Sequence, residues 1–362
     1  MLSGAANAQT ATKTVTAKRG DGILVLLRRN GLDPSKYYKE FIKLNKKNIS
    51  KKNGLYIGRK YILPAKEEEE VPQVETKSDS LEKASPVTEV MVDSVTVEKQ
   101  APAEPEPPKA EPPAPKVVTH SIFGKKLEKV TIESDELKGA IYYLISGHGG
   151  PDPGALIKQG RKLVSEDEYA YDVNLRLARK LIAKGAKVYI IIQDPNDGIR
   201  DQRILEVDYD EVNYPKKKIP RSQRLRLRQR TETVNSLFLS NNSGKGYQRL
   251  IVTHVDSRSV GEVIDVFFYH HERSKKGKRL AESIQETFKK KYARYQPNRK
   301  YSGTVASRSG LYVIKNTMPA MVYIELGNLK NTKDQKRILD YNNREALAKW
   351  ISEGLIADFK KG

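Results

Sequence analysis

The chain contains no cysteine, and only five histidines and one tryptophan occur among its 362 residues. The lack of cysteine excludes disulfide bonds, thiolate nucleophiles and cysteine-ligated zinc, so a bound metal must be held by His, Asp or Glu. The chain also lacks an apolar run of about 18 residues, which a membrane-spanning helix needs. We therefore predict no transmembrane segment.

Positive charge dominates the sequence, but it is unevenly distributed. The net charge is +21, and residues 66–116 hold 13 acidic and 6 basic side chains, a net of −7 that leaves +28 on everything else. Such charge attracts polyanions, including nucleic acid, anionic lipid and the anionic polymers of a bacterial envelope. Charge alone does not choose among these partners.

Composition divides the chain into two folded parts and a linker. Residues 66–119 begin with consecutive glutamates, end in a proline-rich stretch, and contain too few large apolar residues to offset the entropy of folding. We predict a disordered linker with polyproline II character near its end. It would join an N-terminal unit at 14–65 to a larger C-terminal unit at 120–362.

Residues 1–13 form a tail that contains Ala6-Asn7-Ala8. This triplet is typical of the cleavage site of a secretory signal, although the basic and apolar regions that normally precede it are missing. We interpret the tail as the remnant of an export signal, with a meaningless small-residue tail as the alternative.

Apolar, strand-like runs alternate with helical patterns through the C-terminal unit. Strands are expected at 140–146, 187–192, 250–253, 263–269, 311–314 and 320–324, and helices through Leu175 and Leu181 and at 224–239, 280–288 and 344–359. Runs such as IYYLIS and RLIVTH are apolar on both faces, as in sheets that helices cover on both sides. The alternation predicts an α/β fold with a mostly parallel central sheet flanked by helices.

Three polar residues lie at or just after the ends of predicted strands. His148 stands in GHGGPDPGA, His254 in IVTHVD and Glu325 in IELG. A histidine in a glycine-rich turn is more often a capping residue than a ligand, but a second histidine at an equivalent strand end changes that interpretation. Because ligands of such sheets bind at the carboxyl edge, the set indicates a His/His/carboxylate metal site.

At this point the sequence resembles the zinc-dependent N-acetylmuramoyl-L-alanine amidases (amidase type 3 family) over about residues 138–360. Their GHGG-x-DPGA motif is matched at 147–155, their S-I-H-A-N motif by VTHVD, and their PA-V-x-V-E-L-G-F-L-x-N-x-x-D motif at 319–334. Their R-x-x-x-A-N helix is matched from Arg230 to Asn235. The chain departs from the family at Asn328 (usually phenylalanine), Asp256 (usually asparagine) and Gln193-Asp194 (usually threonine-arginine).

The resemblance implies that His148, a helix-opening glutamate and His254 bind Zn²⁺, and that Glu325 acts on the zinc-bound water. The family's EKD motif, which supplies the glutamate, is Glu166-Asp167-Glu168 here. Glu166 matches by spacing, since it lies 19 residues before Gly185. Helical periodicity leaves Glu166 and Glu168 both open, because each would lie on an apolar face. We favour Glu166, with Glu168 as the alternative.

The other histidine pair and an arginine-rich helix have plainer interpretations. His270 and His271 are neighbours on a strand and point to opposite faces, so we expect them at the surface or the cleft rim rather than in one metal site. The helix at 221–230 lacks the interleaved aromatic residues of nucleic-acid binders. We predict a solvated basic face and no nucleic-acid partner.

Residues 14–65 resemble a LysM domain. Its opening strand and Gly-Asp turn are matched by TVTAKRGD, its second region by FIKLN and its closing strand by IGRKYILP, while Gly22 replaces the usual threonine after Gly-Asp. The resemblance implies a small α+β unit of βααβ order with a shallow groove for glycans that contain N-acetylglucosamine. A unit that only caps the enzyme is the alternative.

We therefore expect an exported peptidoglycan hydrolase of the periplasm or cell envelope. It would cleave the amide between N-acetylmuramic acid and the L-alanine of the stem peptide with zinc-activated water, while the N-terminal unit concentrates it on its polymer. The alternatives are a catalytically inactive wall-binding protein and a zinc peptidase that acts on stem peptides. Such a peptidase would share the His/Glu/His set but not the series of motifs.

Overall fold

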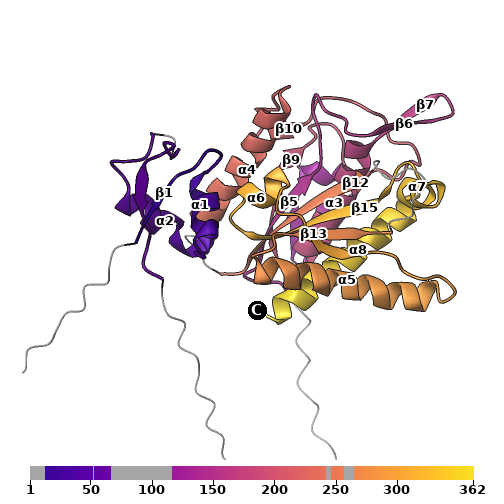
Figure 1. Cartoon of the computed structure of the whole chain (residues 1–362). Helices are drawn as coiled ribbons and strands as arrows, with labels where there is room; N and C mark the ends of the chain where they lie inside the picture. The colour runs from indigo at the N-terminus through magenta and orange to yellow at the C-terminus, as the bar shows by residue number, and fades with distance from the viewer. Residues whose placement is uncertain (1–12, 52, 67–115, 242–245, 257–264) are drawn as a thin grey trace, which may run out of the picture. The chain divides into compact units, whose positions relative to one another are not determined.

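The computed structural model describes residues 13–51, 53–66, 116–241, 246–256 and 265–362 (Figure 1). The predicted signal remnant and nearly all of the predicted linker lie outside these ranges, so those expectations stay predictions. Among the described residues, none of the helices combines the length and the apolar character that crossing a membrane requires.

The N-terminal unit has the predicted βααβ order. Its elements are β1 (Thr14–Thr16), α1 (Ile23–Arg29), α2 (Pro34–Leu44) and β2 (Lys60–Ile62), and β1 pairs with β2 in antiparallel register. The side-chain amide of Asn45 donates to the Ile62 carbonyl and accepts from the Ile62 N–H, both at 2.8 Å. These two bonds attach the closing strand to the end of α2.

The C-terminal unit is built on a six-stranded sheet with the order β14-β13-β15-β12-β5-β8. The strands are β5 (Ile141–Ser146), β8 (Lys187–Ile190), β12 (Gln248–Asp256), β13 (Phe267–His270), β14 (Val305–Ser307) and β15 (Ala320–Asn328). Neighbouring strands are parallel except β13 and β15, which are antiparallel. The prediction of a mostly parallel sheet is confirmed.

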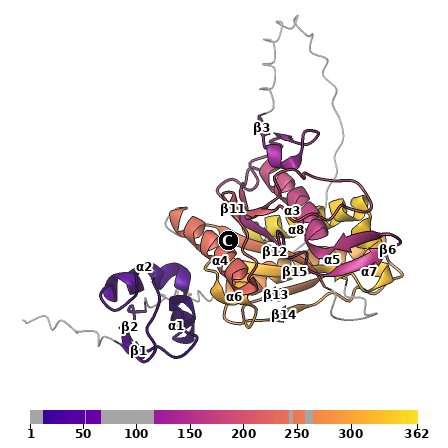
Figure 2. The same cartoon turned by 90° about the horizontal axis from the view of Figure 1, so that it is seen from above.

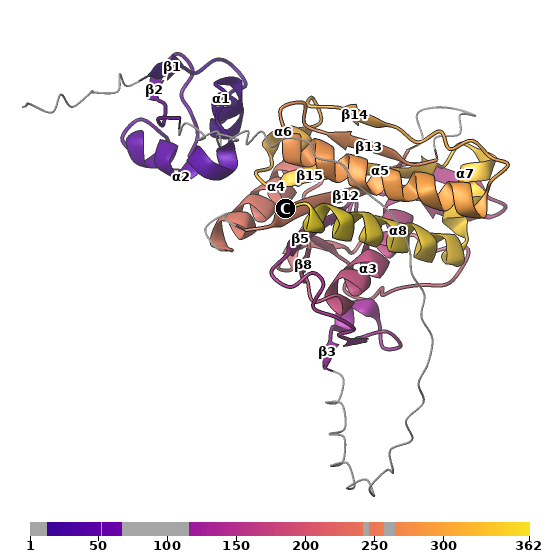
Figure 3. The ribbon, with the colours of Figure 1, turned by 90° about the horizontal axis from the view of Figure 1, so that it is seen from below.

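Helices cover both faces of this sheet. The helices are α3 (Glu166–Ala183), α4 (Gln223–Ser240), α5 (Lys275–Tyr295), α6 (Tyr312–Asn316), α7 (Thr332–Leu339) and α8 (Tyr341–Lys360). α3, α8 and α5 lie side by side over one face (Figure 3), and α4 and α6 lie over the other (Figure 2). Ile251 packs into the hydrophobic core on the side of α3, α5 and α8, and its neighbour Val252 packs into the core on the side of α4 and α6. This explains why strand β12 is apolar on both faces.

Short elements complete the C-terminal unit. They are β3 (Val117–Thr119), the 3₁₀ turn η1 (Ser121–Phe123), β4 (Lys129–Thr131), β6 (Leu156–Gln159), β7 (Lys162–Ser165), β9 (Ile192–Gln193), β10 (Val212–Asn213) and β11 (Lys217–Lys218). β3 lies within the range predicted as linker, but it pairs with β4, so the folded part begins slightly earlier than expected. The β6–β7 hairpin leads the chain directly into α3.

One predicted strand is wrong. Leu311 is the N-cap of the short helix α6 and residues 312–314 begin it, with Val313 and Ile314 buried against the sheet. These residues do not pair with β15, the strand that follows them, because β15 already has β12 on one side and β13 on the other. A short apolar run cannot be assigned to strand or helix by periodicity alone.

Candidate active site

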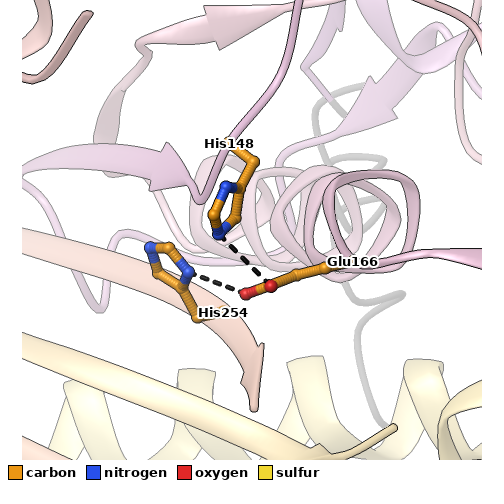
Figure 4. Close-up of side chains that lie close together, drawn as sticks. All are labelled: His148, Glu166 and His254. Carbon is orange, nitrogen blue, oxygen red and sulfur yellow. Dashed lines mark hydrogen bonds and ion pairs between the residues drawn. The ribbon is translucent and has the colours of Figure 1, made fainter. Parts of the chain in front are cut away.

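Three side chains from separate elements meet at the carboxyl edge of the sheet (Figure 4). His148 follows β5, Glu166 is the first residue of α3, and His254 lies inside β12 rather than after its end. Glu166 lies between the histidines, with Oε1 2.8 Å from Nδ1 of His254 and Oε2 3.2 Å from Nε2 of His148. Each offers a potential ligand atom, and these atoms all lie within 4.8 Å of one another.

Glycines in the loop after β5 make this approach possible. His148 has a φ of 60°, in the left-handed region. Gly147 lies directly against the His254 ring, and a Cβ at Gly154 would stand 2.7 Å from the His148 ring and 2.8 Å from Oε2 of Glu166. Side chains at these two positions would push the three groups apart, which gives a physical reason for glycine in GHGGPDPGA.

The two candidate glutamates have different surroundings. Glu166 accepts backbone N–H groups from Ala155 and Val255, both at 3.1 Å, so its carboxylate is fixed between the histidines. Glu168 is fully buried elsewhere, where it pairs with Arg200 at 2.5 Å and accepts the Asp208 N–H at 3.2 Å. The structure therefore brings Glu166, and not Glu168, next to the histidines.

A cavity of about 470 Å³ opens onto the three side chains, and Glu325 lines it as well. Glu325 belongs to β15 and lies beside His254 in the parallel register of β12 and β15. Its side chain is 2% exposed. Tyr323, on the same strand, stacks on the His254 ring with the centroids 4.6 Å apart and the planes at 12°. Glu325 thus reaches the cavity without being one of the three clustered groups.

The sequence of residues 143–357 matches the family described as N-acetylmuramoyl-L-alanine amidase, which is more than half of the chain. The chain belongs to this family. The predicted activity, hydrolysis of the amide between N-acetylmuramic acid and L-alanine in peptidoglycan, is therefore confirmed at the level of the family. No curated protein matches the chain.

Solved amidases resemble the chain at low identity. The CwlD amidase of Clostridioides difficile, solved with the GerS lipoprotein, is 19% identical, and the match covers 62% of this chain and all of that one with a TM-score of 0.45. AmiC2 of Nostoc punctiforme is 17% identical over 61% and 98% of the two chains, with a TM-score of 0.43. Ami1 of Mycobacterium smegmatis is 15% identical over 62% and 99%, also with a TM-score of 0.43.

Two arginines of the amidase that the sequence placed on a solvated face are buried at the site. Arg226 pairs with Asp152, whose Oδ2 lies 3.1 Å from Nδ1 of His148. Arg230 donates to the His148 carbonyl at 2.9 Å. The sequence contained one indication of this arrangement: Arg226 and Arg230 are one helical turn apart, which places both on the same face of α4. That face orients the His148 loop instead of meeting solvent.

The charges at the site shift its pKa values in opposite directions. Burial lowers the pKa of His148, but Asp152 and Glu166 outweigh it and raise the pKa to about 10. Burial raises the pKa of Glu166, but the two histidines outweigh it and hold that pKa well below its usual range. Burial dominates at His254 and lowers its pKa. The arrangement thus stabilises positive charge beside an ionised Glu166.

The prediction for the second histidine pair is wrong in one respect. His270 and His271 do not join the site, as expected, but they are buried, with exposed fractions of 6% and 9%, rather than at the surface. Nδ1 of His271 accepts the Arg273 N–H at 3.1 Å, and Nδ1 of His270 lies 3.0 Å from the His271 carbonyl. Local backbone contacts thus satisfy Nδ1 of both rings, which favours their burial.

Proposed function

We propose that the amidase holds Zn²⁺ with His148, Glu166 and His254 and that Glu325 moves the proton in the hydrolysis. The observation that carries the proposal is the cluster itself: two imidazoles and one carboxylate converge beside a cavity. This donor set suits zinc, which in catalytic sites takes three protein ligands and keeps a fourth position for water. Zinc, when bound, lowers the pKa of a coordinated water from 15.7 to about 7.

The chain's own residues have distinct tasks in this proposal. Water attacks the carbonyl carbon of the amide, Glu325 takes the proton that the water loses, and the carbon–nitrogen bond breaks. Glu325 then delivers the proton to the departing nitrogen of L-alanine, so the products are a carboxylic acid on the muramic acid and a free amine. Such acid–base transfer contributes typically 10²- to 10⁴-fold to the rate.

Asp152 and Arg226 act as positioning residues. The Asp152 carboxylate fixes the His148 ring through Nδ1, which leaves Nε2 directed toward Glu166. Arg226 in turn holds Asp152. Metal-ligating histidines are commonly oriented by a carboxylate in this way, and loss of that partner typically costs 10- to 100-fold in metal affinity or activity.

Glu325→Gln tests the assignment of the proton carrier. The change keeps size and hydrogen bonding but removes the proton acceptor, so we expect zinc content and folding to persist while release of stem peptides falls by at least about 100-fold. Glu286→Gln, on the exposed face of α5, is the matched control and should keep wild-type turnover. Loss of zinc from Glu325→Gln would make Glu325 a ligand, and near-wild-type turnover would remove its catalytic role.

We further propose that the N-terminal unit binds the glycan of the substrate. In the segment between α2 and β2, Tyr56 and Ile57 are 46% and 69% exposed. The guanidinium of Arg59 lies 4.5 Å from the centre of the Tyr56 ring and holds it in place. An exposed, rigid aromatic ring beside an apolar side chain is a suitable stacking surface for a sugar ring.

Tyr56→Ala tests this binding. We expect it to weaken co-sedimentation of the full chain with purified peptidoglycan several-fold, because the stacking surface is lost. Tyr341→Ala, which removes an exposed tyrosine of the C-terminal unit, is the control. Equal co-sedimentation of both variants with wild type would leave the N-terminal unit without a glycan-binding role.

We also propose export to the periplasm or cell envelope, because peptidoglycan lies there. Ala6-Asn7-Ala8, which supports this, falls outside the described residues. Fractionation of cells that express the tagged chain tests it, and retention of all the protein in the cytoplasm would contradict it.

A further inference from the structure

A group of carboxylates gathers beside the first turn of α3, apart from the proposed zinc ligands. We call it the acidic cluster; its members are Glu168, Asp194, Asp197, Asp208, Asp210 and Glu211. They form three overlapping sets, and within each set one oxygen per residue lies within 4.8 Å of the others. One of these sets is Asp194, Asp208 and Asp210, which joins the turn after β9 to the segment before β10.

Basic side chains do not balance this negative charge. In the described part of the chain, Arg200 is the one basic residue that forms an ion pair with the acidic cluster, and it contacts Glu168 and Asp197. Asp194 also stands where the family that the sequence resembles usually has arginine. This chain therefore has a negative charge at a position where a positive one is common.

Two buried oxygens of the acidic cluster have no hydrogen-bond partner among the described residues. Asp194 is 4% exposed; its Oδ1 accepts the N–H groups of Asn196 and Asp197, but its Oδ2 has no partner. Oδ1 of Asp208 is likewise buried without a partner. Both oxygens belong to the same set of three, and leaving such atoms unpaired is costly.

The acidic cluster must be neutralised by protons or by a cation. Burial raises the pKa of Asp194 to about 7; hydrogen bonds from the Asp197 and Asn196 N–H groups oppose this shift, and the charges of Asp208 and Asp197 add to it. Burial likewise raises the pKa of Asp208, with Asp210 adding to the shift. At neutral pH Asp194 is thus poised between the two states, and a divalent cation would pair the orphaned oxygens of Asp194 and Asp208 and offset the repulsion between the carboxylates.

We propose that Asp194, Asp208 and Asp210 bind a Ca²⁺ ion, with Glu168 and Glu211 close to it. The donors are all carboxylate oxygens, without a histidine, so the set favours a hard cation over zinc. Irregular backbone supplies the aspartates, and Asp210 remains exposed. Ca²⁺ tolerates such flexible geometry and takes 6–8 oxygens, whereas Mg²⁺ requires a near-ideal octahedron.

The position of the acidic cluster gives the ion a structural role. Glu211 accepts the Gly150 N–H at 2.6 Å, two residues after His148. Glu168 lies two residues after Glu166 on α3. An ion that fixes the segment 194–211 would therefore hold the backbone on two sides of the proposed zinc site. The calcium proposal rests on the acidic cluster and stands or falls independently of the zinc assignment.

Thermal unfolding of the full chain with and without calcium tests the proposal. The protein is dialysed into buffer freed of divalent cations on a chelating resin, and its zinc content is measured before and after. Extracellular calcium sites bind with Kd values of roughly 10⁻⁴ to 10⁻³ M, so 10 mM CaCl₂ should raise Tm by about 5 °C. Equimolar MgCl₂ should raise it by less than half as much.

Asp194→Asn and Asp135→Asn are compared in the same assay. Asp135 is an exposed acid on the surface of the C-terminal unit, so its variant should keep the full calcium-dependent rise. Asp194→Asn should lose the rise and should be at least as stable as wild type without calcium, because one repelling charge is gone. Asp210→Asn, at an exposed position, provides the same readout if Asp194→Asn does not fold. No rise in wild type, or an undiminished rise in the cluster variants, overturns the proposal.

Discussion

Replacement of Asp152 tests how the amidase orients its first histidine. Asp152 Oδ2 lies 3.1 Å from Nδ1 of His148, and the same oxygen accepts Arg226. Loss of a carboxylate that orients a metal-bound histidine costs about 10- to 100-fold, or about 1.4–2.7 kcal/mol. Because the Asp152 side chain is 26% exposed, solvent screens it, and we expect Asp152→Ala to lie near the lower end, with about tenfold weaker zinc binding.

Competition with a zinc-chelating dye at several pH values measures this affinity. The zinc affinity of Asp152→Asn should fall less than that of Asp152→Ala, because the amide oxygen of the asparagine can still accept a hydrogen bond from Nδ1–H of His148. In Arg226→Ala the Asp152 carboxylate remains but is held less firmly, so the decrease in zinc affinity should be smaller still. Asp135→Ala is the surface control. Zinc binding by Asp152→Ala that equals wild type would refute the orienting role.

Three further predictions follow from the contacts described above. His148→Ala and His254→Ala should each lose zinc and activity together, as metal analysis beside a turnover assay will show. Asp265 is fully buried; burial raises its pKa, but hydrogen bonds from Ser302 and the charges of two arginines outweigh it and hold the pKa below its usual range. Asp265→Asn should therefore lower the unfolding free energy by about 3 kcal/mol at pH 7. The difference from wild type should shrink as the pH falls below about 4, where the wild-type carboxylate takes up its proton, and urea unfolding at several pH values measures it. Deletion of residues 14–65 should reduce binding to intact peptidoglycan but leave turnover of a small soluble muropeptide unchanged.

The sequence predicted the sheet well because its strands are buried on both faces. Residues 141–146 are buried along nearly their whole length, so the strand appears in the sequence as an uninterrupted apolar run. The four-residue run at 311–314 carries too little pattern to separate a strand from a helix, and in the structure both sides of the following strand, β15, are occupied by β12 and β13. A local sequence pattern does not show which strands will be neighbours in the folded sheet.

The candidate site shows a similar division. The motifs placed His148 and His254 at strand ends, and the structure shows that their strands, β5 and β12, are parallel neighbours, which brings the two ends together. Periodicity could not separate Glu166 from Glu168, because both are buried and differ only in their partners. The sequence also did not predict the ion pair of Arg226 with Asp152, because the two residues are 74 positions apart. Local pattern reports burial, whereas the identity of a buried partner depends on the assembled fold.

The zinc content of Glu166→Gln and Glu168→Gln, measured by atomic spectroscopy on the folded full-length protein, tests the central assignment most directly. Glu166 lies between the two histidines and Glu168 pairs with Arg200. We predict that Glu166→Gln loses its zinc and its release of stem peptides, while Glu168→Gln keeps one zinc per chain. A Glu166→Gln protein that retains one zinc per chain, or a Glu168→Gln protein that folds without it, would contradict the proposed site.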